Sequence, residues 1–203
     1  MIRLLALSLA GFALAPFAGA QAPKKPPGKL PEFAVEVAKI RKGVDAKLAP
    51  ISAAVEKDYE AAKTEGDREA IVAKSRAESE KIRAPAHAQA MKLLLPNAAD
   101  PAAAAGLVWV GSSNDLSLQT EAVTLLRKHH LVRPETLAFA KDNKQTAYAW
   151  VEGLLRAQFA AADLPADQRW RVQLALAMCL QNLAAVPTLI ADNPGQVESV
   201  YGS

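Results

Sequence analysis

Apolar residues recur every three or four positions along most of this chain, the spacing of one face of an α-helix. The clearest run lies in residues 32–63. It forms one stripe of Phe33, Val37, Ile40, Val44, Leu48, Ile51, Val55 and Tyr59. Pro50 could kink one long helix or start a second helix after a brief break, and we expect the continuous kinked helix because the stripe keeps its phase through the proline. Charged residues occupy its other faces.

A second charged segment follows this helix. Residues 64–67, Thr-Glu-Gly-Asp, are typical of a turn in which Asp67 caps the next helix. Residues 68–83 then predict a helix that packs antiparallel to the first. Ala84-Pro85 marks a bend or a new start. After it, we expect a buried face made of His87, Ala88, Met91, Leu94 and Leu95.

From Asp100 onward the pattern is one of short helices separated by turns. Asp100 is a typical N-cap residue, and Pro101 after it is typical of the first helical position. Pro101, Pro134 and Pro165 lie 33 and 31 residues apart, and each opens a predicted helix. Asn143 is expected to cap another helix, and a further helical piece is expected after residue 185. The predicted helices cover residues 102–110, 116–130, 134–141, 145–161 and 165–183.

These elements predict an all-α fold, since no segment alternates apolar and polar residues as a strand does. We expect a long charged helical arm beside an irregular array of antiparallel helical hairpins. The proline spacing suggests tetratricopeptide-like solenoid character, although the side-chain pattern of that repeat is absent. We expect the stable core in residues 100–183. The predicted divisions are a signal peptide at 1–20, a linker at 21–31, the arm at 32–83 and the array at 84–203.

The first twenty residues predict export. Arg3 gives a positive start, an apolar run extends from Leu4 to Phe17, and small residues precede Gln21. This is the pattern of a secretory signal peptide cleaved after Ala20. A retained membrane anchor is the alternative, but the run is shorter than the roughly 20 residues that a spanning helix needs. We therefore expect a periplasmic or other extracytoplasmic protein.

The balance of charged residues limits the classes of partner that we expect. The chain carries 24 Lys and Arg against 21 Asp and Glu, a formal charge of +3. Removal of Arg3 with the signal peptide lowers this to +2. Such a balance lacks the clustered basic face of a nucleic-acid-binding protein. The linker at 21–31 is rich in proline and lysine. We expect membrane contact only through this linker or the signal segment.

Few residues in the chain are candidates for catalysis or ligand binding, and we expect no catalytic residue, cofactor or metal. Cys179 is the only cysteine. It shares a helical stripe with Val172, Ala175, Leu176 and Leu183, which predicts a buried, inert thiol. An exposed thiol that exchanges with another chain is the alternative. A metal site is not expected, because the adjacent His129 and His130 point in different directions on a helix and His87 is distant in sequence.

Two further sets of residues are candidates for chemistry. Ser112 and Ser113 follow Gly111, and we expect turn and capping roles because no nucleophile elbow is present. Trp109, Trp150 and Trp170 fall on three predicted helices. They are expected in the core or along a groove rather than in a ligand cage. If one groove exists, these tryptophans are the first candidates to line it.

Residues 61–185 resemble a known family. The matching segments include Ala61 to Glu69, Asn97 to Val110, Ala122 to His130 and Pro134 to Leu137. They are similar to the helical region that precedes the redoxin domain in a group of exported bacterial thioredoxin-like proteins. In that family a thioredoxin-like fold follows, often with a Cys-x-x-Cys pair. Cys179 does not match those cysteines, so no redox residue carries over.

The resemblance implies an exported accessory role. We therefore expect a non-enzymatic helical interaction module that binds a protein partner, for which a redoxin-domain protein is one candidate. A truncated or split thiol-disulfide oxidoreductase component, acting with a separate redoxin domain, is the alternative. A hydrolase with an unrecognised site is a third possibility, and it would require a pocket of convergent titratable residues.

Overall fold

The computed structural model describes residues 29–144 and 149–192, and the side chains of residues 186–192 are not described. The predicted signal peptide, most of the linker and Pro194-Gly195 lie outside these residues. Within them the chain forms seven α-helices, two short 3-10 helices and no strand. The α-helices are α1 (Glu32–Ala61), α2 (Glu65–Leu94), α3 (Ala104–Gly111), α4 (Leu116–His129), α5 (Pro134–Asp142), α6 (Ala149–Ala160) and α7 (Ala166–Asp192).

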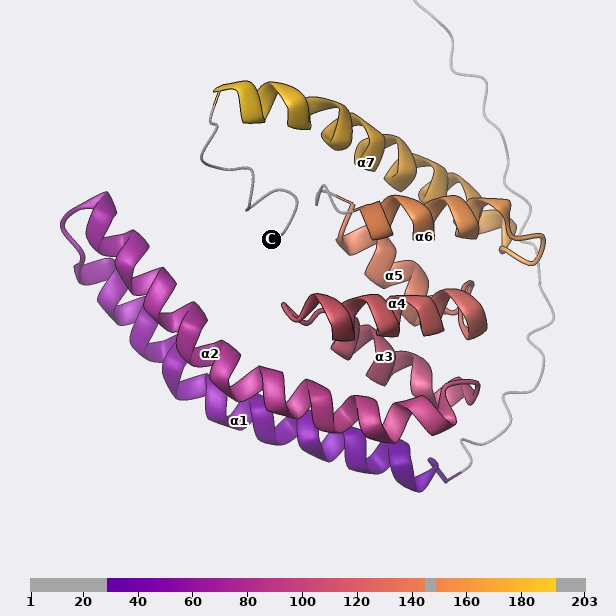
Figure 1. Ribbon diagram of the computed structural model, residues 1–203, viewed down its shortest axis with the longest axis horizontal. Helices are drawn as coiled ribbons and strands as arrows, with labels where there is room; N and C mark the ends of the chain where they lie inside the picture. The colour runs from indigo at the N-terminus through magenta and orange to yellow at the C-terminus, as the bar shows by residue number, and fades with distance from the viewer. Residues whose placement is uncertain (1–28, 145–148, 193–203) are drawn as a thin grey trace, which may run out of the picture.

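The helices lie roughly in chain order across the molecule (Figure 1). The α1–α2 hairpin forms one end and α7 the other, with α3, α4, α5 and α6 between them. Part of the hairpin extends past α3 and α4, so its turn lies away from the other helices. The predicted all-α fold of packed helical hairpins is therefore confirmed. The tetratricopeptide-like solenoid character of this irregular array stays a prediction.

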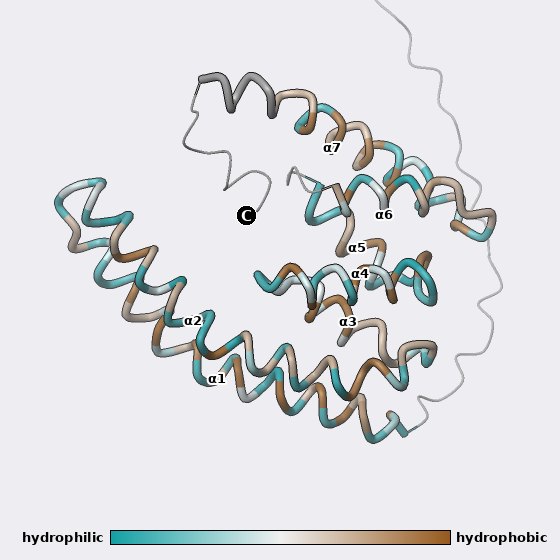
Figure 2. Tube along the Cα trace, in the orientation of Figure 1, coloured by the Kyte–Doolittle hydropathy of each residue, from teal (hydrophilic) through white to brown (hydrophobic). Residues whose placement is uncertain are grey.

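The first helix is continuous, as its apolar stripe predicts. Pro50 lies inside α1, and Val37, Val44 and Leu48 on the stripe are buried. Tyr59, at the far end of the stripe, is exposed. The hydropathy pattern follows this change, because polar residues dominate the projecting part of the hairpin (Figure 2). The arm is thus well packed only where the body of the protein covers it.

The start of α2 differs from the prediction by one turn. Thr64, not Asp67, is the N-cap, and its Oγ1 accepts a hydrogen bond from the Asp67 backbone N–H at 3.1 Å. The Asp67 carboxylate accepts in return from the Thr64 backbone N–H at 3.3 Å. This reciprocal pair is a capping box. Asp67 is suited to cap, but it acts from the third helical position.

No restart occurs at Ala84-Pro85, because α2 continues through Pro85 to Leu94. The expected division between residues 83 and 84 therefore falls inside one helix. His87, Met91 and Leu94 are buried as predicted, and Ala90 is buried with them. Leu95 is exposed, contrary to expectation, because it starts the 3-10 helix Leu95–Asn97 and leaves the buried face.

The later helices largely follow their sequence signals. Asp100 caps the 3-10 helix Pro101–Ala103, which leads into α3, and its carboxylate accepts from the Ala102 N–H at 2.8 Å. Asn143, expected to cap the helix predicted at 145–161, is instead the C-cap of α5, and its side chain donates to the Phe139 carbonyl at 2.8 Å. Residues 145–148, where that predicted helix begins, lie outside the described residues. The piece expected after residue 185 is part of α7, which runs unbroken to Asp192.

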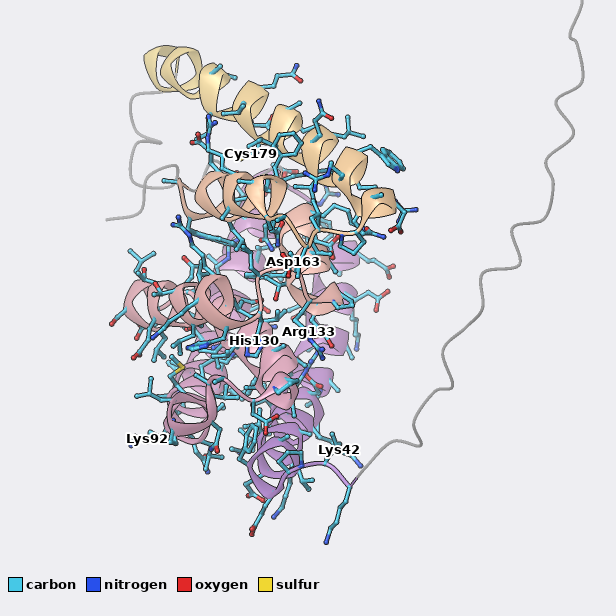
Figure 3. The ribbon with its side chains drawn as sticks, turned by 90° about the vertical axis from the view of Figure 1, so that its right-hand side faces the viewer. Lys42, Lys92, His130, Arg133, Asp163 and Cys179 are labelled. Carbon is cyan, nitrogen blue, oxygen red and sulfur yellow. The ribbon has the colours of Figure 1, made fainter. Side chains whose placement is uncertain are left out.

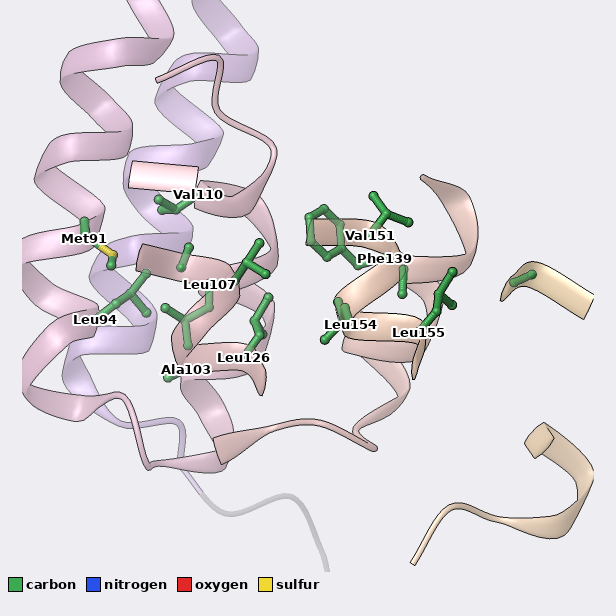
Figure 4. Packing of buried hydrophobic residues seen from close by; sticks show 14 of the residues in the cluster. Met91, Leu94, Ala103, Leu107, Val110, Leu126, Phe139, Val151, Leu154 and Leu155 are labelled. Carbon is green, nitrogen blue, oxygen red and sulfur yellow. The ribbon is translucent and has the colours of Figure 1, made fainter. Parts of the chain in front are cut away.

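One hydrophobic cluster links both parts of the molecule. It joins Val37 and Leu94 of the α1–α2 hairpin to Leu107 and Leu126 of α3 and α4, and continues through α5 and α6 to Cys179 on α7. Figure 4 shows this packing around Leu94, Leu107 and Leu126. The core is therefore wider than the predicted residues 100–183, because the arm contributes to it directly.

The arm approaches α3 at a glycine. A Cβ on Gly106 would lie 2.8 Å from Leu94 Cδ2 and 3.2 Å from Val37 Cγ1. Leu94 is almost fully buried, so it has little room to move. The absent side chain at Gly106 therefore sets how closely α3 packs against both α1 and α2.

We predict that Gly106→Val destabilises the fold by about 1–3 kcal/mol, the usual range for overpacking a core. Gly153→Val is the matched control, because a Cβ at Gly153 on α6 meets nothing within 4 Å. Urea unfolding monitored by circular dichroism gives both free energies. Equal stabilities for the two variants would contradict the close approach at Gly106.

Candidate functional site

The three tryptophans have three different environments. Trp109 on α3 lies edge-on to His87, with 4.6 Å between ring centroids. Trp150 on α6 stacks on Phe139 at 5.1 Å and packs against the core. Trp170 on α7 is 58% exposed, with the Arg171 guanidinium 5.4 Å from its ring centroid. The sequence correctly placed two of them against the core, but the three do not line one groove.

Trp109 does line a groove, which we call the α1–α3 groove. It has a volume of about 210 Å³ and lies beside the first turns of α1. Gly106 and Leu94 contribute to its wall, and Arg41 is its only charged lining residue. Within the described residues Arg41 makes no ion pair. The full lining is Leu30, Ala34, Val37, Ala38, Arg41, Leu94, Ala102, Ala105, Gly106 and Trp109.

A second groove lies between α5 and α7 and has a volume of about 310 Å³. Leu137, Leu155 and Val172 supply apolar surface to it. Lys141, Arg171 and Asp167 supply charge. This α5–α7 groove is more polar than the α1–α3 groove and contains no tryptophan. Its charged groups belong to helix surfaces and form no acid–base or nucleophile–base pair.

Cys179 is buried as predicted, with no exposed surface. It lies between α7 and α6 (Figure 3), with Val172 and Ala175 of its stripe also buried. Burial raises the pKa of the Cys179 thiol above its ordinary value, and the nearby Glu152 carboxylate raises it further. Thiol exchange requires the thiolate. Both effects therefore disfavour the exchanging-thiol alternative.

The three histidines have different environments. His130 is buried, and its ring Nε2 lies 2.7 Å from the Ala98 carbonyl oxygen, to which the Nε2–H tautomer donates. His129 is exposed at the end of α4. His87 is 3% exposed, and neither ring nitrogen has a hydrogen-bond partner among the described residues. In the same part of the chain, no group of three or more His, Cys, Asp or Glu side chains could hold a metal ion.

The turn after α3 has the expected structural roles. Ser112 donates its hydroxyl to the Val108 carbonyl at 3.1 Å. The Ser113 hydroxyl accepts from the Asp115 backbone N–H at 3.2 Å. Asp115 in turn caps α4 through the Ser117 and Leu118 N–H groups. Both hydroxyls therefore bond to backbone groups of their own turn, as expected.

The sequence reasoning missed a buried amide. Gln158 of α6 is fully buried, and its side-chain nitrogen donates to the carbonyls of Leu131 and Thr136, each at 3.2 Å. These two bonds fix α6 against the loop before α5 and the first turn of α5. Helical spacing alone could have indicated that Gln158 is buried, because it follows Leu154 and Leu155 on the same face of the helix. A lone glutamine in an alanine-rich helix gave no reason to single it out.

Comparisons with known proteins leave the family open. No protein-family model matches the chain, and neither the curated proteins nor the solved structures include a significant match. Among the described helices, none combines the length and the apolar character required to cross a lipid bilayer.

We predict that the Cys179 thiol of the native chain reacts slowly with a thiol reagent at neutral pH and rapidly after unfolding in urea. Burial and the raised pKa both suppress the reactive thiolate. The control is Ala160→Cys in a Cys179→Ala background, because Ala160 is exposed on α6. Rapid native labelling of Cys179, at the rate of the Ala160→Cys control, would contradict its burial. Cys179→Ala should cost about 1 kcal/mol.

We predict that the fold loses stability as pH falls below about 6.5. Burial is the main effect that lowers the pKa values of His87 and His130 from the ordinary 6.5. Both groups therefore bind protons more readily in the unfolded chain. Their contribution is complete above the unfolded pKa and is lost as pH falls toward the lowered folded values. Urea unfolding at a series of pH values from 7 to 5 measures the slope.

The matched variants for this test are His87→Phe and Phe159→Leu. His87→Phe keeps an aromatic ring against Trp109 and should flatten the dependence of stability on pH. Phe159→Leu alters an exposed ring on α6 that does not titrate and should leave the dependence unchanged. An unaltered slope in His87→Phe would show that His87 does not contribute.

Proposed function

We propose that this chain is an exported, non-enzymatic helical interaction module, and that it binds a protein partner in the α1–α3 groove. The observation that carries the proposal is the groove itself, where Trp109 borders an almost wholly apolar surface. Tryptophan is enriched where proteins bind one another, because it buries a large apolar area and keeps one polar group. The function of the region that this chain resembles supports an accessory role.

The residues that line the groove indicate what kind of partner segment would bind there. Apolar side chains of the partner would replace water against Ala34, Ala38 and Ala105. Arg41 at the rim favours a carboxylate on the same segment, because it makes no ion pair within the described chain. A helix or strand with two or three apolar anchors and an adjacent Asp or Glu fits these requirements. A redoxin-domain protein is the partner that the resemblance implies.

Export is the second part of the proposal. It rests on the signal-peptide pattern in residues 1–20, which lie outside the described part of the structure. An extracytoplasmic location places the groove in the same compartment as exported redoxin proteins. The non-enzymatic part of the proposal is consistent with the burial of Cys179, which disfavours thiol exchange.

The test is site-specific photo-cross-linking in the native cells. The full chain carries benzoylphenylalanine at position 38, inside the groove, or at position 46 as control. Ala46 is exposed on the same helix and does not line the groove. We expect a cross-linked partner from position 38 alone. Equal cross-linking from both positions, or from neither, would contradict the proposed surface.

The identified partner then permits a quantitative measurement. Calorimetry with the purified partner should show at least a tenfold loss of affinity for Ala38→Arg, which fills the groove with a charged side chain. Ala46→Arg should bind as the unaltered chain does. Arg41→Glu should weaken binding, with a smaller effect at high salt, because it reverses the charge that faces the carboxylate.

A further inference from the structure

His87 is a buried titratable group in contact with the wall of the α1–α3 groove. Its side chain is 3% exposed, and neither ring nitrogen has a hydrogen-bond partner among the described residues. Buried polar groups in folded proteins nearly always have such a partner. The ring lies edge-on to Trp109, with 4.6 Å between centroids and 75° between planes. Because Trp109 lines the groove, a group that can gain a proton supports one side of the proposed binding surface.

The charges on α2 leave a protonated His87 without a counter-charge. Arg83 lies four residues before it, where helical side chains are neighbours, so two cations would face each other. Glu80 lies about 10 Å away along the helix axis, and its carboxylate already accepts a hydrogen bond from the Asn114 side chain at 2.6 Å. Burial lowers the pKa of His87 most, Glu80 opposes this effect, and Arg83 adds to it.

The helices packed against this part of α2 also offer no acid to the ring. Helix α3 contains no charged residue. Helix α1 supplies a cation, Arg41, to the same groove, and its Asp45 is exposed. Glu121 on α4 is exposed as well. Once protonated, both ring nitrogens of His87 are donors. Water is the acceptor that remains for them, and the ring reaches it only by leaving its buried position.

From this geometry we propose that His87 makes the α1–α3 groove sensitive to acid. When His87 gains a proton, its ring leaves the buried position, Trp109 loses the ring that it packs against, and the groove loses the shape that binds the partner. This inference deepens the proposed function. It rests on that function for the loss of binding, but the movement of Trp109 can be measured without any partner.

The linkage between proton and partner fixes the direction of the effect. The partner binds the form in which His87 is neutral, so protonation and partner binding oppose each other. Affinity is therefore highest at neutral pH and falls as pH drops through the lowered pKa of His87, below the ordinary 6.5. A single proton changes the affinity by at most about tenfold per pH unit.

The first test follows Trp109 in the absence of a partner. In a chain with Trp150→Phe and Trp170→Phe, Trp109 is the only tryptophan, and quenching of its fluorescence by acrylamide reports its exposure. We expect quenching to rise at least twofold between pH 7 and pH 4.5. His87→Phe in the same background should remove the rise. Constant quenching of Trp109, or an equal rise in His87→Phe, would overturn the proposal.

A second single-tryptophan chain separates this local movement from unfolding of the whole protein. Trp109→Phe with Trp170→Phe retains Trp150, which is also partly buried but stacks on Phe139. Its quenching should stay constant over the pH range in which quenching of Trp109 rises. Equal changes at both tryptophans would assign the effect to global unfolding and overturn the local role of His87.

NMR titration of the His87 ring protons in the unaltered chain gives the direction directly, and it decides the matter even if His87→Phe does not fold. We expect a midpoint below pH 6.5, with the indole signal of Trp109 shifting at the same midpoint. A midpoint at or above 6.5 would show that the imidazolium is stabilised beside Trp109, and would overturn the proposal.

The last test uses the partner captured by cross-linking from position 38. Calorimetry at pH 7.5 and pH 5.0 should show an affinity that falls at least threefold for the unaltered chain and clearly less for His87→Phe. Equal losses for the two chains would overturn the control of binding by His87. Failure to capture a partner would contradict the proposed function, whereas the fluorescence of Trp109 would still decide whether His87 moves the groove wall.

Discussion

The close approach of α3 to the α1–α2 hairpin is the constraint on which the rest of the structure depends. Helix α3 has only eight residues, too few for a helix that is stable alone. It is held because Gly106 lets Val37 and Leu94 come within contact of its backbone. The same crossing joins the arm to the hydrophobic cluster that continues to α7. Because only 5% of the residues are aromatic, the core depends on small side chains that let the helices pack closely.

This crossing also creates the proposed binding surface. Because Gly106 has no side chain, α3 and α1 approach closely at one level, while small residues on both helices leave a shallow space beside it. Trp109 borders that space and contacts the buried His87 behind it. The groove therefore adjoins the best-packed part of the molecule rather than the projecting arm. Ion pairs contribute little to this arrangement, since those formed by Glu36 and Glu65 join neighbours on one exposed helix face.

Much of the fold was predictable because its helices have regular periodicity and recognisable ends. The α1 stripe, the Asp100 cap and the burial of Cys179 all followed from local spacing. The errors arose where local signals were ambiguous. Thr64 and Asp67 are both good capping residues, and in a capping box they bond to each other. Leu95 has helical phase, but the chain tightens into a 3-10 helix there. The site was less predictable, because a groove depends on which helices cross, and helical spacing alone does not show which of Trp109, Trp150 and Trp170 borders it.

Trp170 shows why periodicity alone cannot assign a face. Helix α7 carries two apolar stripes, one through Val172, Ala175 and Cys179 and another through Trp170, Leu174 and Ala177. Either stripe alone would predict an ordinary amphipathic helix. Only the position of α6 decides which stripe is covered, and it covers the one that contains the cysteine. The other stripe therefore stays exposed among the described residues, at Trp170 and Leu174, because one helix cannot turn both faces toward α6.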